Sequence, residues 1–223
     1  SYVETILVER YQPEMRPALE ALSYTGWVMG LDALPAARSV RQPVSNSYEA
    51  EEAFDGITYV KGAAVMAMLH SWLGDAPFRA GLRAYLRDNS WGNASADELF
   101  AALGGASGHD VRSVAHTFVD QPGVPLVRAS LVCERDDPPR VELSQERYRG
   151  RPSSARTDAD PLWSIPVCVE VGRGKRARAE ERVCGLLAER ATTLTLAPGP
   201  CPTWLLPNAS YAGYYRYAMP LGD

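Results

Sequence analysis

The stretch of the sequence best placed to do chemistry is Phe54 to Asp75 (FDGITYVKGAAVMAMLHSWLGD), in which Tyr59 precedes Lys61-Gly62. The apolar residues from Ala63 to Leu73 predict a buried helix just after Tyr59. A phenol has a pKa of about 10, so at neutral pH it stays protonated and can donate a hydrogen bond to a developing oxyanion. A tyrosine in this position is also typical of the edge of a core, with its hydroxyl in water. Tyr59 is therefore a candidate catalytic residue with a plain structural alternative.

The three histidines, His70, His109 and His116, lack the spacing of a metal site. Two histidines bind one metal from a helix when they lie three or four residues apart, as in HExxH. We therefore predict structural or surface histidines and no metal ligand in this chain. The sequence also lacks a GxSxG nucleophile elbow, a P-loop and a GxGxxG turn, so we predict no cofactor-binding residue.

The formal net charge of −4 creates no field that would favour nucleic acid or an anionic membrane. The basic tract Gly172 to Arg182 (GRGKRARAEER) contains Glu180 and Glu181 and no aromatic residue for base stacking, so we predict a solvated hairpin tip. No apolar run has transmembrane length, and residues 1–30 lack the order of a signal peptide. We expect a soluble segment without membrane insertion or nucleic-acid partner. Asn208-Ala209-Ser210 is a formal glycosylation triplet.

All four cysteines, Cys133, Cys168, Cys184 and Cys201, fall in the second half of the chain and match no CxxC spacing. Cys168 and Cys184 flank a predicted hairpin that would bring them within bridging range. One or two disulfides would indicate an exported protein. Four small buried core residues in a reducing compartment are the alternative. We therefore expect an exported or cell-envelope location if the cysteines are bridged, and a cytoplasmic one otherwise.

The first half of the chain predicts a series of short helices. Pro13 and Pro17 interrupt the pattern of residues 1–30, so two short helices are expected there. The stretch from Leu31 to Ser47 has two prolines and no apolar period, which predicts an irregular connection. Further helices are predicted at 63–73, 77–88, 96–103 and 111–121, the third starting with a Ser95–Glu98 capping box and ending at Gly104-Gly105.

After Pro122-Gly123-Val124-Pro125 the hydrophobic period becomes two, which is typical of strands. The expected strands are VRASLVCE, RVELSQERY, WSIPVCVEV, ERVCGLLAE and TTLTLAP. Their spacing predicts an antiparallel β-sandwich, with a polar, mobile loop at Gly150 to Asp160. We therefore predict an α+β chain of two domains, an all-α domain over residues 1–125 and a β-sandwich over residues 126–223. The aromatic segment Trp204 to Tyr217 is expected to pack the sandwich against the helices.

Several stretches together resemble the gluzincin zinc aminopeptidases, the family of aminopeptidase N, alanyl aminopeptidase and leukotriene hydrolase. FDGITYVKGAAVMAML is similar to the segment that carries their transition-state tyrosine, and Phe118 stands where they usually have tryptophan. The other similar stretches, in the same order as in the family, are LDALPAARSVRQPV, LGDAPFRAGLRAYLRDNSWGNASADELFAAL, TFVDQPGVPLV, WSIPVCVEV and WLLPNASYAGYYRY. Because nearly the whole chain is covered in the right order, the resemblance is more specific than any single motif.

The resemblance implies the C-terminal half of a thermolysin-like catalytic domain followed by a β-sandwich domain. It implies a zinc-dependent enzyme that removes amino-terminal residues from peptide substrates, with Tyr59 as the residue that stabilises the tetrahedral oxyanion. The HExxH and later glutamate of the family, and its GxMEN-type segment, are absent here. Zinc is therefore expected in the full-length protein, bound by an upstream catalytic half of the same polypeptide, and this chain alone is expected to be inactive.

Two other interpretations stay open. A non-catalytic relative of the same family would use the scaffold for protein interactions, and its upstream segment would lack the zinc ligands. A free-standing, export-associated β-sandwich binding protein with a helical cap would require the gene to begin near Ser1. The sequence directly upstream of Ser1 distinguishes these interpretations.

Overall fold

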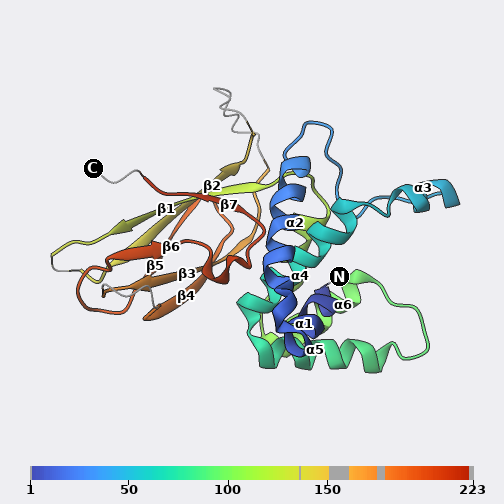
Figure 1. Ribbon diagram of the computed structural model, residues 1–223, viewed down its shortest axis with the longest axis horizontal. Helices are drawn as coiled ribbons and strands as arrows, with labels where there is room; N and C mark the ends of the chain where they lie inside the picture. The colour runs from blue at the N-terminus through green and yellow to red at the C-terminus, as the bar shows by residue number, and fades with distance from the viewer. Residues whose placement is uncertain (1, 136, 151–160, 175–178, 221–223) are drawn as a thin grey trace.

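The structure, a computed structural model, describes residues 2–135, 137–150, 161–174 and 179–220. Helices form the first half of the chain and strands the second, and the two parts lie next to each other in Figure 1. The helices are α1 (Tyr2–Tyr11), α2 (Pro17–Asp32), α3 (Ser47–Glu52), α4 (Gly62–Leu73), α5 (Asp75–Asp88), α6 (Ala96–Ser107) and α7 (Val111–Val119). A π-helical turn (Ile57–Lys61) leads into α4, and 3-10 turns lie at Pro13–Met15 and Ala209–Tyr211. The predicted α+β composition is confirmed.

The break between the first two helices lies where the prolines predict it. α1 ends before Pro13, and α2 begins at Pro17, whose missing N–H is no loss in the first turn of a helix. The prediction of a short second helix is wrong, because α2 has 16 residues and continues to Asp32. The irregular connection that follows ends at α3, a short helix without an apolar period. Its cap is the Asn46 side chain, which accepts the N–H of Glu49 at 3.0 Å.

The predicted capping box at the start of α6 is confirmed. The Ser95 hydroxyl accepts the N–H of Glu98 at 3.3 Å, and the Glu98 carboxylate accepts the N–H of Ser95 at 2.6 Å. The predicted end at Gly104-Gly105 is wrong, because α6 runs through both glycines and stops at Gly108, whose φ is 74°. A side chain on Gly104 would meet the carbonyl oxygen of His109 at 3.0 Å. Close packing therefore places glycine inside a helix despite its low helix propensity.

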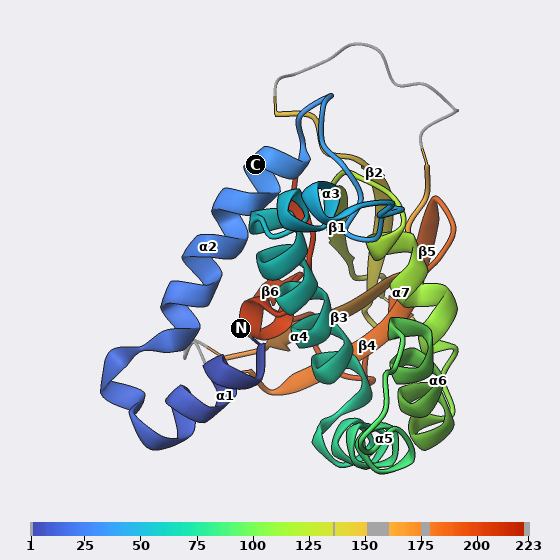
Figure 2. The same ribbon diagram turned by 90° about the vertical axis from the view of Figure 1, so that its right-hand side faces the viewer.

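Helix α4 occupies the middle of the helical part, between α2 and α7 in Figure 2. The predicted burial of this helix is confirmed: Val65, Met68 and Leu69 are buried, and Trp72 is partly buried against the same core. Both α1 and α7 contact α4, as does strand β3 of the second half. Packing on several sides fixes α4, and with it the π-helical turn at its start.

The second half forms two sheets, with strand orders β5-β2-β1-β7 and β4-β3-β6. The strands are β1 (Pro125–Val132), β2 (Arg140–Arg147), β3 (Ile165–Gly172), β4 (Glu181–Leu187), β5 (Ala191–Thr195), β6 (Trp204–Leu206) and β7 (Arg216–Ala218). All five predicted strands are present, and most pairs are antiparallel. The predicted antiparallel pairing has one exception among the described strands, because β7 pairs in parallel with β1. Parallel neighbours need a long crossover, and here the chain passes through the other sheet between them.

The change from helices to strands lies between Val119, the last residue of α7, and Pro125, the first of β1. The division of the chain into two domains at this point stays a prediction. The C-terminal aromatic segment packs the sheets against the helices, as predicted. Arg216 of β7 donates to the carbonyl oxygen of Gly26 in α2 at 3.0 Å, and the Tyr214 hydroxyl also reaches α2.

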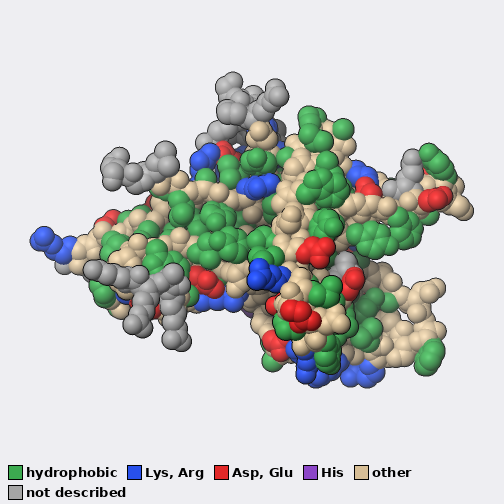
Figure 3. Space-filling view, viewed as in Figure 1, with side chains coloured by type: hydrophobic (Ala, Val, Ile, Leu, Met, Phe, Trp, Pro, Cys, Tyr) green, Lys and Arg blue, Asp and Glu red, His purple; other side chains and the backbone are tan. Residues whose placement is uncertain are grey.

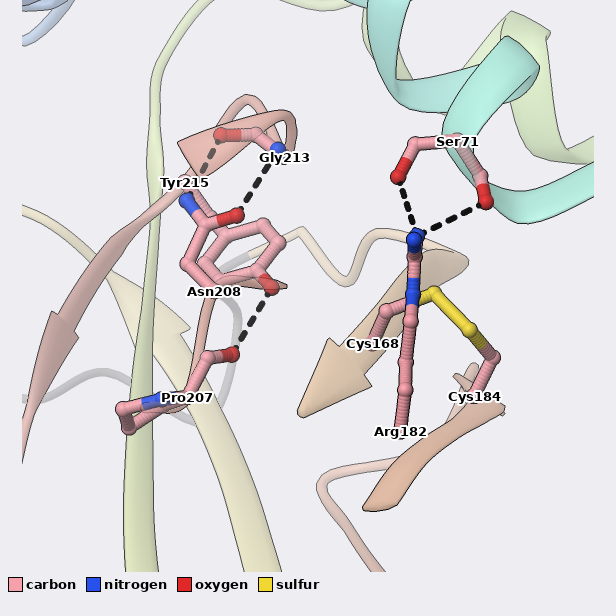
Figure 4. Close-up of a disulfide and its surroundings, with 8 residues drawn as sticks. All are labelled: Ser71, Cys168, Arg182, Cys184, Pro207, Asn208, Gly213 and Tyr215. Atoms are coloured by element: carbon pink, nitrogen blue, oxygen red, sulfur yellow. Dashed lines mark hydrogen bonds between the residues drawn. A yellow bond between two sulfur atoms is a disulfide. The ribbon is translucent and has the colours of Figure 1, made fainter. Parts of the chain in front are cut away.

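Strand β4 makes a further contact to the helices. Figure 4 shows the Arg182 side chain reaching Ser71 of α4, to which it donates at 3.0 Å (carbonyl oxygen) and 2.6 Å (hydroxyl oxygen). The cysteine two residues later, Cys184, is bonded to Cys168 directly opposite on β3. The predicted Cys168–Cys184 bridge is therefore present, and a second bridge joins Cys133 to Cys201. No cysteine is free.

Asn208 of the glycosylation triplet is not accessible. It is 5% exposed, and Figure 4 shows its side-chain amide bonded to both backbone groups of Gly213. The amide therefore closes a turn, and a glycan attached to its nitrogen would have to displace the residues that bury it.

No helix in the described ranges is long and apolar enough to cross a membrane. The predicted mobile loop at 150–160 lies almost entirely outside the described residues, as does the middle of the basic tract at 172–182.

Protein purified without reductant and denatured should show no free thiols among its four cysteines. In thermal unfolding, Cys133→Ser/Cys201→Ser should be the more destabilised of two double variants, because its bridge spans 68 residues and the other spans 16. Loop-closure entropy gives about 4 kcal/mol for the longer loop and about 3 kcal/mol for the shorter. Two or more free thiols per chain in the unmodified protein would contradict the pairing.

Candidate functional site around Tyr59

Tyr59 lies in the π-helical turn Ile57–Lys61, which continues into α4 without a break. Asp55 starts this turn: its side chain accepts the N–H of Thr58, and its carbonyl oxygen accepts the N–H of Tyr59, both at 3.0 Å. Single π-helical turns are rare and often occur at functional sites, because the extra residue redirects the side chains of the turn. The sequence predicted the helix after Tyr59 but not the π-helical turn that carries it.

The Tyr59 side chain points away from the core. It is 48% exposed, and its ring centroid lies 6.0 Å from that of Phe54. Its hydroxyl has no hydrogen-bond partner among the residues that the structure describes, so the O–H is available to an outside acceptor. This placement is compatible with both a catalytic phenol and a wetted core-edge residue, and the catalytic role of Tyr59 stays a prediction.

A buried polar cluster lies beneath the turn. The ammonium of Lys61 is 2.9 Å from the carboxylate of Asp32, and both side chains are fully buried. The same carboxylate accepts the Tyr214 hydroxyl at 3.0 Å and the N–H of Gly123 at 2.8 Å. Lys61 also donates to the carbonyl oxygen of Gln121 at 3.2 Å. A buried charge needs a partner and further hydrogen bonds, and this cluster supplies both.

The electrostatics of the cluster follow from burial. Burial lowers the pKa of Lys61, and the negative charge of Asp32 opposes that shift. Burial and the same carboxylate raise the pKa of the Tyr214 phenol far above its ordinary value, so that it stays a hydrogen-bond donor. The Lys61 ammonium also lies 5.5 Å from the centroid of the Tyr214 ring, a cation–π distance.

Sequence reasoning missed this cluster, although a signal for it existed. Asp32 ends the apolar stretch GWVMGL, and Lys61 stands inside ITYVKGAAVMAML. A charged residue within an apolar run is rarely buried without a partner, so each indicates an unseen opposite charge. The sequence could not show that the two residues pair, because 28 residues of chain separate them.

The connection between α2 and α3 is bonded to the start of the π-helical turn. Arg38 forms an ion pair with Asp55 at 2.6 Å and donates to the Thr58 hydroxyl at 3.1 Å. The same guanidinium donates to the carbonyl oxygen of Ala53 at 3.3 Å. The loop that precedes Tyr59 in the sequence therefore also supports it in space.

A second arginine fastens the same connection to α6 and α7. Arg41 makes a two-point contact with Asp120, at 2.6 and 2.7 Å, and an ion pair with Asp97 at 2.9 Å. His116 lies between the two carboxylates, 2.8 Å from Asp97 and 3.2 Å from Asp120. A bidentate arginine–carboxylate contact is among the stronger surface interactions, so this network fixes the middle of the connection.

The other two histidines have structural contacts. His70 bonds to the Tyr2 hydroxyl at 2.5 Å, lies 3.2 Å from Asp75 and stacks on Phe78 with ring centroids 4.3 Å apart. His109 packs against Trp72. Within the ranges that the structure describes, no three His, Cys, Asp or Glu residues are grouped so as to hold a metal ion.

An apolar groove of about 650 Å³ lies between α1, α2, α4 and the 3-10 turn Ala209–Tyr211. Its wall includes Val60 and Ala63, the neighbours of the site residues on the π-helical turn and α4, but not Tyr59 itself. The groove and the exposed phenol are therefore separate features of the same surface region.

The helical part of the chain, which contains Tyr59, matches a known protein family. The model of the peptidase family M1 domain matches residues 1–118, which is more than half of the chain. The chain belongs to peptidase family M1. The match ends within α7, so it includes the π-helical turn and the loop before it but none of the strands.

Individual relatives of this family M1 chain extend the similarity into the sheets. Over 220 residues the chain is 30% identical to the puromycin-sensitive aminopeptidase of Caenorhabditis elegans, covering 97% of this chain and 22% of that protein. It is 28% identical to aminopeptidase M1 of Arabidopsis thaliana over 225 residues, covering 97% and 24%. Aminopeptidase N of Lactococcus lactis subsp. cremoris is 36% identical over 148 residues, covering 66% and 16%. The chain thus spans about a fifth of the length of these relatives.

The Arg41 network should make the stability of the protein against thermal unfolding depend on pH under acidic conditions. His116, and then Arg41, hold the pKa of the Asp97 carboxyl below its ordinary value of 3.8. Because the folded state favours the carboxylate, its stabilising contribution is complete above about pH 5 and is lost as the pH falls below 3.8. We expect the difference in melting temperature between wild type and Asp97→Asn to shrink between pH 6 and pH 3.

The control is Glu9→Gln, which removes an exposed carboxylate of α1. Its melting temperature should follow wild type across the same range. A difference between wild type and Asp97→Asn that stays constant with pH would show that the charge of Asp97 does not contribute.

Proposed function

We propose that this chain is part of a zinc-dependent aminopeptidase that removes amino-terminal residues from peptides, and that Tyr59 is its catalytic residue in this segment. The observation that carries the proposal is a half-exposed phenol on a π-helical turn, in a chain of peptidase family M1. The buried Lys61–Asp32 pair lies beneath this turn and holds it. The relatives that bear aminopeptidase names support the class of reaction.

The chemistry that Tyr59 can perform follows from its position. When the carbonyl carbon of a peptide bond becomes tetrahedral, its oxygen gains negative charge. A protonated phenol held near that oxygen donates a hydrogen bond that is stronger in the transition state than in the ground state, and this difference accelerates the reaction. The hydroxyl of Tyr59, exposed and without a protein acceptor in the described ranges, is suited to this role.

The zinc ligands would have to come from outside this chain. The described residues contain no cluster that fits a zinc site, and the histidines are engaged in the contacts given above. No step of the proposed reaction therefore runs through a metal held by these residues. The upstream catalytic half of the same polypeptide is proposed to hold it, and the isolated chain is expected to hydrolyse no peptide.

The surface of the helical part has an exposed apolar area that suits contact with another part of the protein. Figure 3 shows hydrophobic side chains along α2, where Leu19, Tyr24 and Trp27 are each more than half exposed. Leu19 and Tyr24 also line the apolar groove of about 650 Å³. Exposed apolar area of this kind marks a contact surface. We propose that the upstream catalytic half covers it, making residues 1–125 the C-terminal half of a thermolysin-like catalytic domain and residues 126–223 a β-sandwich domain.

The two disulfides support a location outside the reducing cytoplasm. We propose that the protein is exported or lies in the cell envelope. Cell fractionation with immediate thiol alkylation tests this: the protein should appear in an oxidising compartment with no alkylated cysteine. Recovery in the cytoplasmic fraction with four alkylated cysteines would overturn it.

In the intact protein, Tyr59→Phe should lower kcat by roughly a hundred- to a thousandfold, the typical loss for one oxyanion donor. Hydrolysis of alanine and leucine p-nitroanilides measures turnover, and metal analysis should show unchanged zinc content. Tyr85→Phe, which removes a phenol hydroxyl from α5, is the matched control and should keep wild-type turnover. Unchanged kcat in Tyr59→Phe would refute its catalytic role, and an intact protein without zinc or turnover would favour the non-catalytic scaffold.

A further inference from the structure

Tyr59 and Lys61 belong to the same π-helical turn but face opposite ways. Tyr59 is 48% exposed, whereas the Lys61 side chain is completely buried. Residues two positions apart point to roughly opposite sides of a helical turn, so the orientation of one side chain sets that of the other. Whatever fixes the Lys61 ammonium therefore also fixes the rotation of the turn that presents the phenol.

The Lys61 ammonium is fixed by groups from three separate parts of the chain. Asp32 comes from the end of α2, the Gln121 carbonyl oxygen from the connection between α7 and β1, and the Tyr214 ring from the C-terminal segment. Asp32 is itself held by the Tyr214 hydroxyl and by the N–H of Gly123. The φ of Gly123 is 109°, a conformation that favours glycine, and it aims this N–H at the carboxylate.

We propose that Lys61 is a positioning residue for Tyr59, and that Asp32 and Tyr214 act through it. This inference rests on the proposed role of Tyr59 in oxyanion stabilisation. The start of the turn is held separately by Asp55 and Arg38, so Lys61 provides the fixation of its other end.

The Tyr59 side chain has little else to hold it. Its hydroxyl has no partner among the described residues, and its ring contact is the neighbouring Phe54, which is itself 69% exposed. The backbone of the turn thus determines where the hydroxyl lies. Displacement of a catalytic group by about 1 Å can cost on the order of a hundredfold in rate, so a small rotation of the turn should be visible in kcat.

Two adjacent tyrosines offer a matched pair of variants. Tyr214 and Tyr215 are both buried phenols with one hydroxyl hydrogen bond each, but Tyr214 donates to Asp32 and Tyr215 to the carbonyl oxygen of Pro207 at 2.9 Å. In the intact protein, Tyr214→Phe should lower kcat about tenfold, less than the roughly hundredfold cost of a 1 Å displacement, because Asp32 still pairs with Lys61 and the turn is displaced only in part. The KM and the zinc content should stay the same, and Tyr215→Phe should keep wild-type kcat.

A second measurement does not depend on activity. Hydrogen exchange followed by mass spectrometry should show faster exchange in the peptide that contains Ile57–Lys61 for Tyr214→Phe, and no change there for Tyr215→Phe. Lys61→Met, where it folds, should show the same acceleration more strongly, because it leaves the Asp32 carboxylate buried without its partner. Unchanged exchange at 57–61 in Tyr214→Phe would overturn the proposal.

A double-variant cycle separates this inference from the proposed function. If Tyr214 acts through Tyr59, Tyr59→Phe/Tyr214→Phe should be no slower than Tyr59→Phe alone, whereas an unrelated structural effect would multiply with it. A multiplied loss would overturn the positioning role and leave the role of Tyr59 intact. Full kcat in Tyr59→Phe would instead refute the proposed function, and the exchange data would still report whether the cluster holds the turn.

Discussion

The buried ion pair between Asp32 and Lys61 is the interaction on which the rest of the structure depends. Two fully buried charges are costly to remove from water, and the cost is offset only when every remaining donor and acceptor is bonded. Here the bonds come from the Gln121 carbonyl, the Gly123 N–H and the Tyr214 hydroxyl. The helical part and the sheets therefore fit together in this arrangement, because Asp32 and Lys61 pair within the helical part but depend on the Tyr214 hydroxyl, from the C-terminal segment, for a further hydrogen bond.

Two further contacts join the helical segment to the two sheets. Arg216 on β7 reaches Gly26 of α2, and Arg182 on β4 reaches Ser71 of α4, so both sheets are bonded to helices that flank the π-helical turn. These arginine–carbonyl contacts lie nearer the surface than the ion pair. As directional, charge-assisted hydrogen bonds, they help to orient the sheets relative to the helices. In this protein of family M1, the position of Tyr59 would therefore depend on contacts with segments that are distant from it in the sequence.

Much of the architecture follows from local sequence alone. The period of apolar residues predicted α4 and the five main strands, and turn chemistry predicted the Ser95–Glu98 capping box. The hairpin predicted between Cys168 and Cys184 brings the two cysteines within bridging range, as expected. These features depend on neighbours within a few residues or on one hairpin, so the local sequence is enough to predict them.

By itself, then, the sequence determined most of the helices, five of the seven strands in the described ranges, the family resemblance and the candidate role of Tyr59. Only the tertiary structure decided that Asp32, Lys61 and Tyr214 form one cluster, that β7 lies parallel to β1, and that α6 continues through Gly104. The reason is that burial and pairing are properties of surfaces that meet. A charge within an apolar stretch shows that a partner exists, and only the packing of distant segments shows which residue it is.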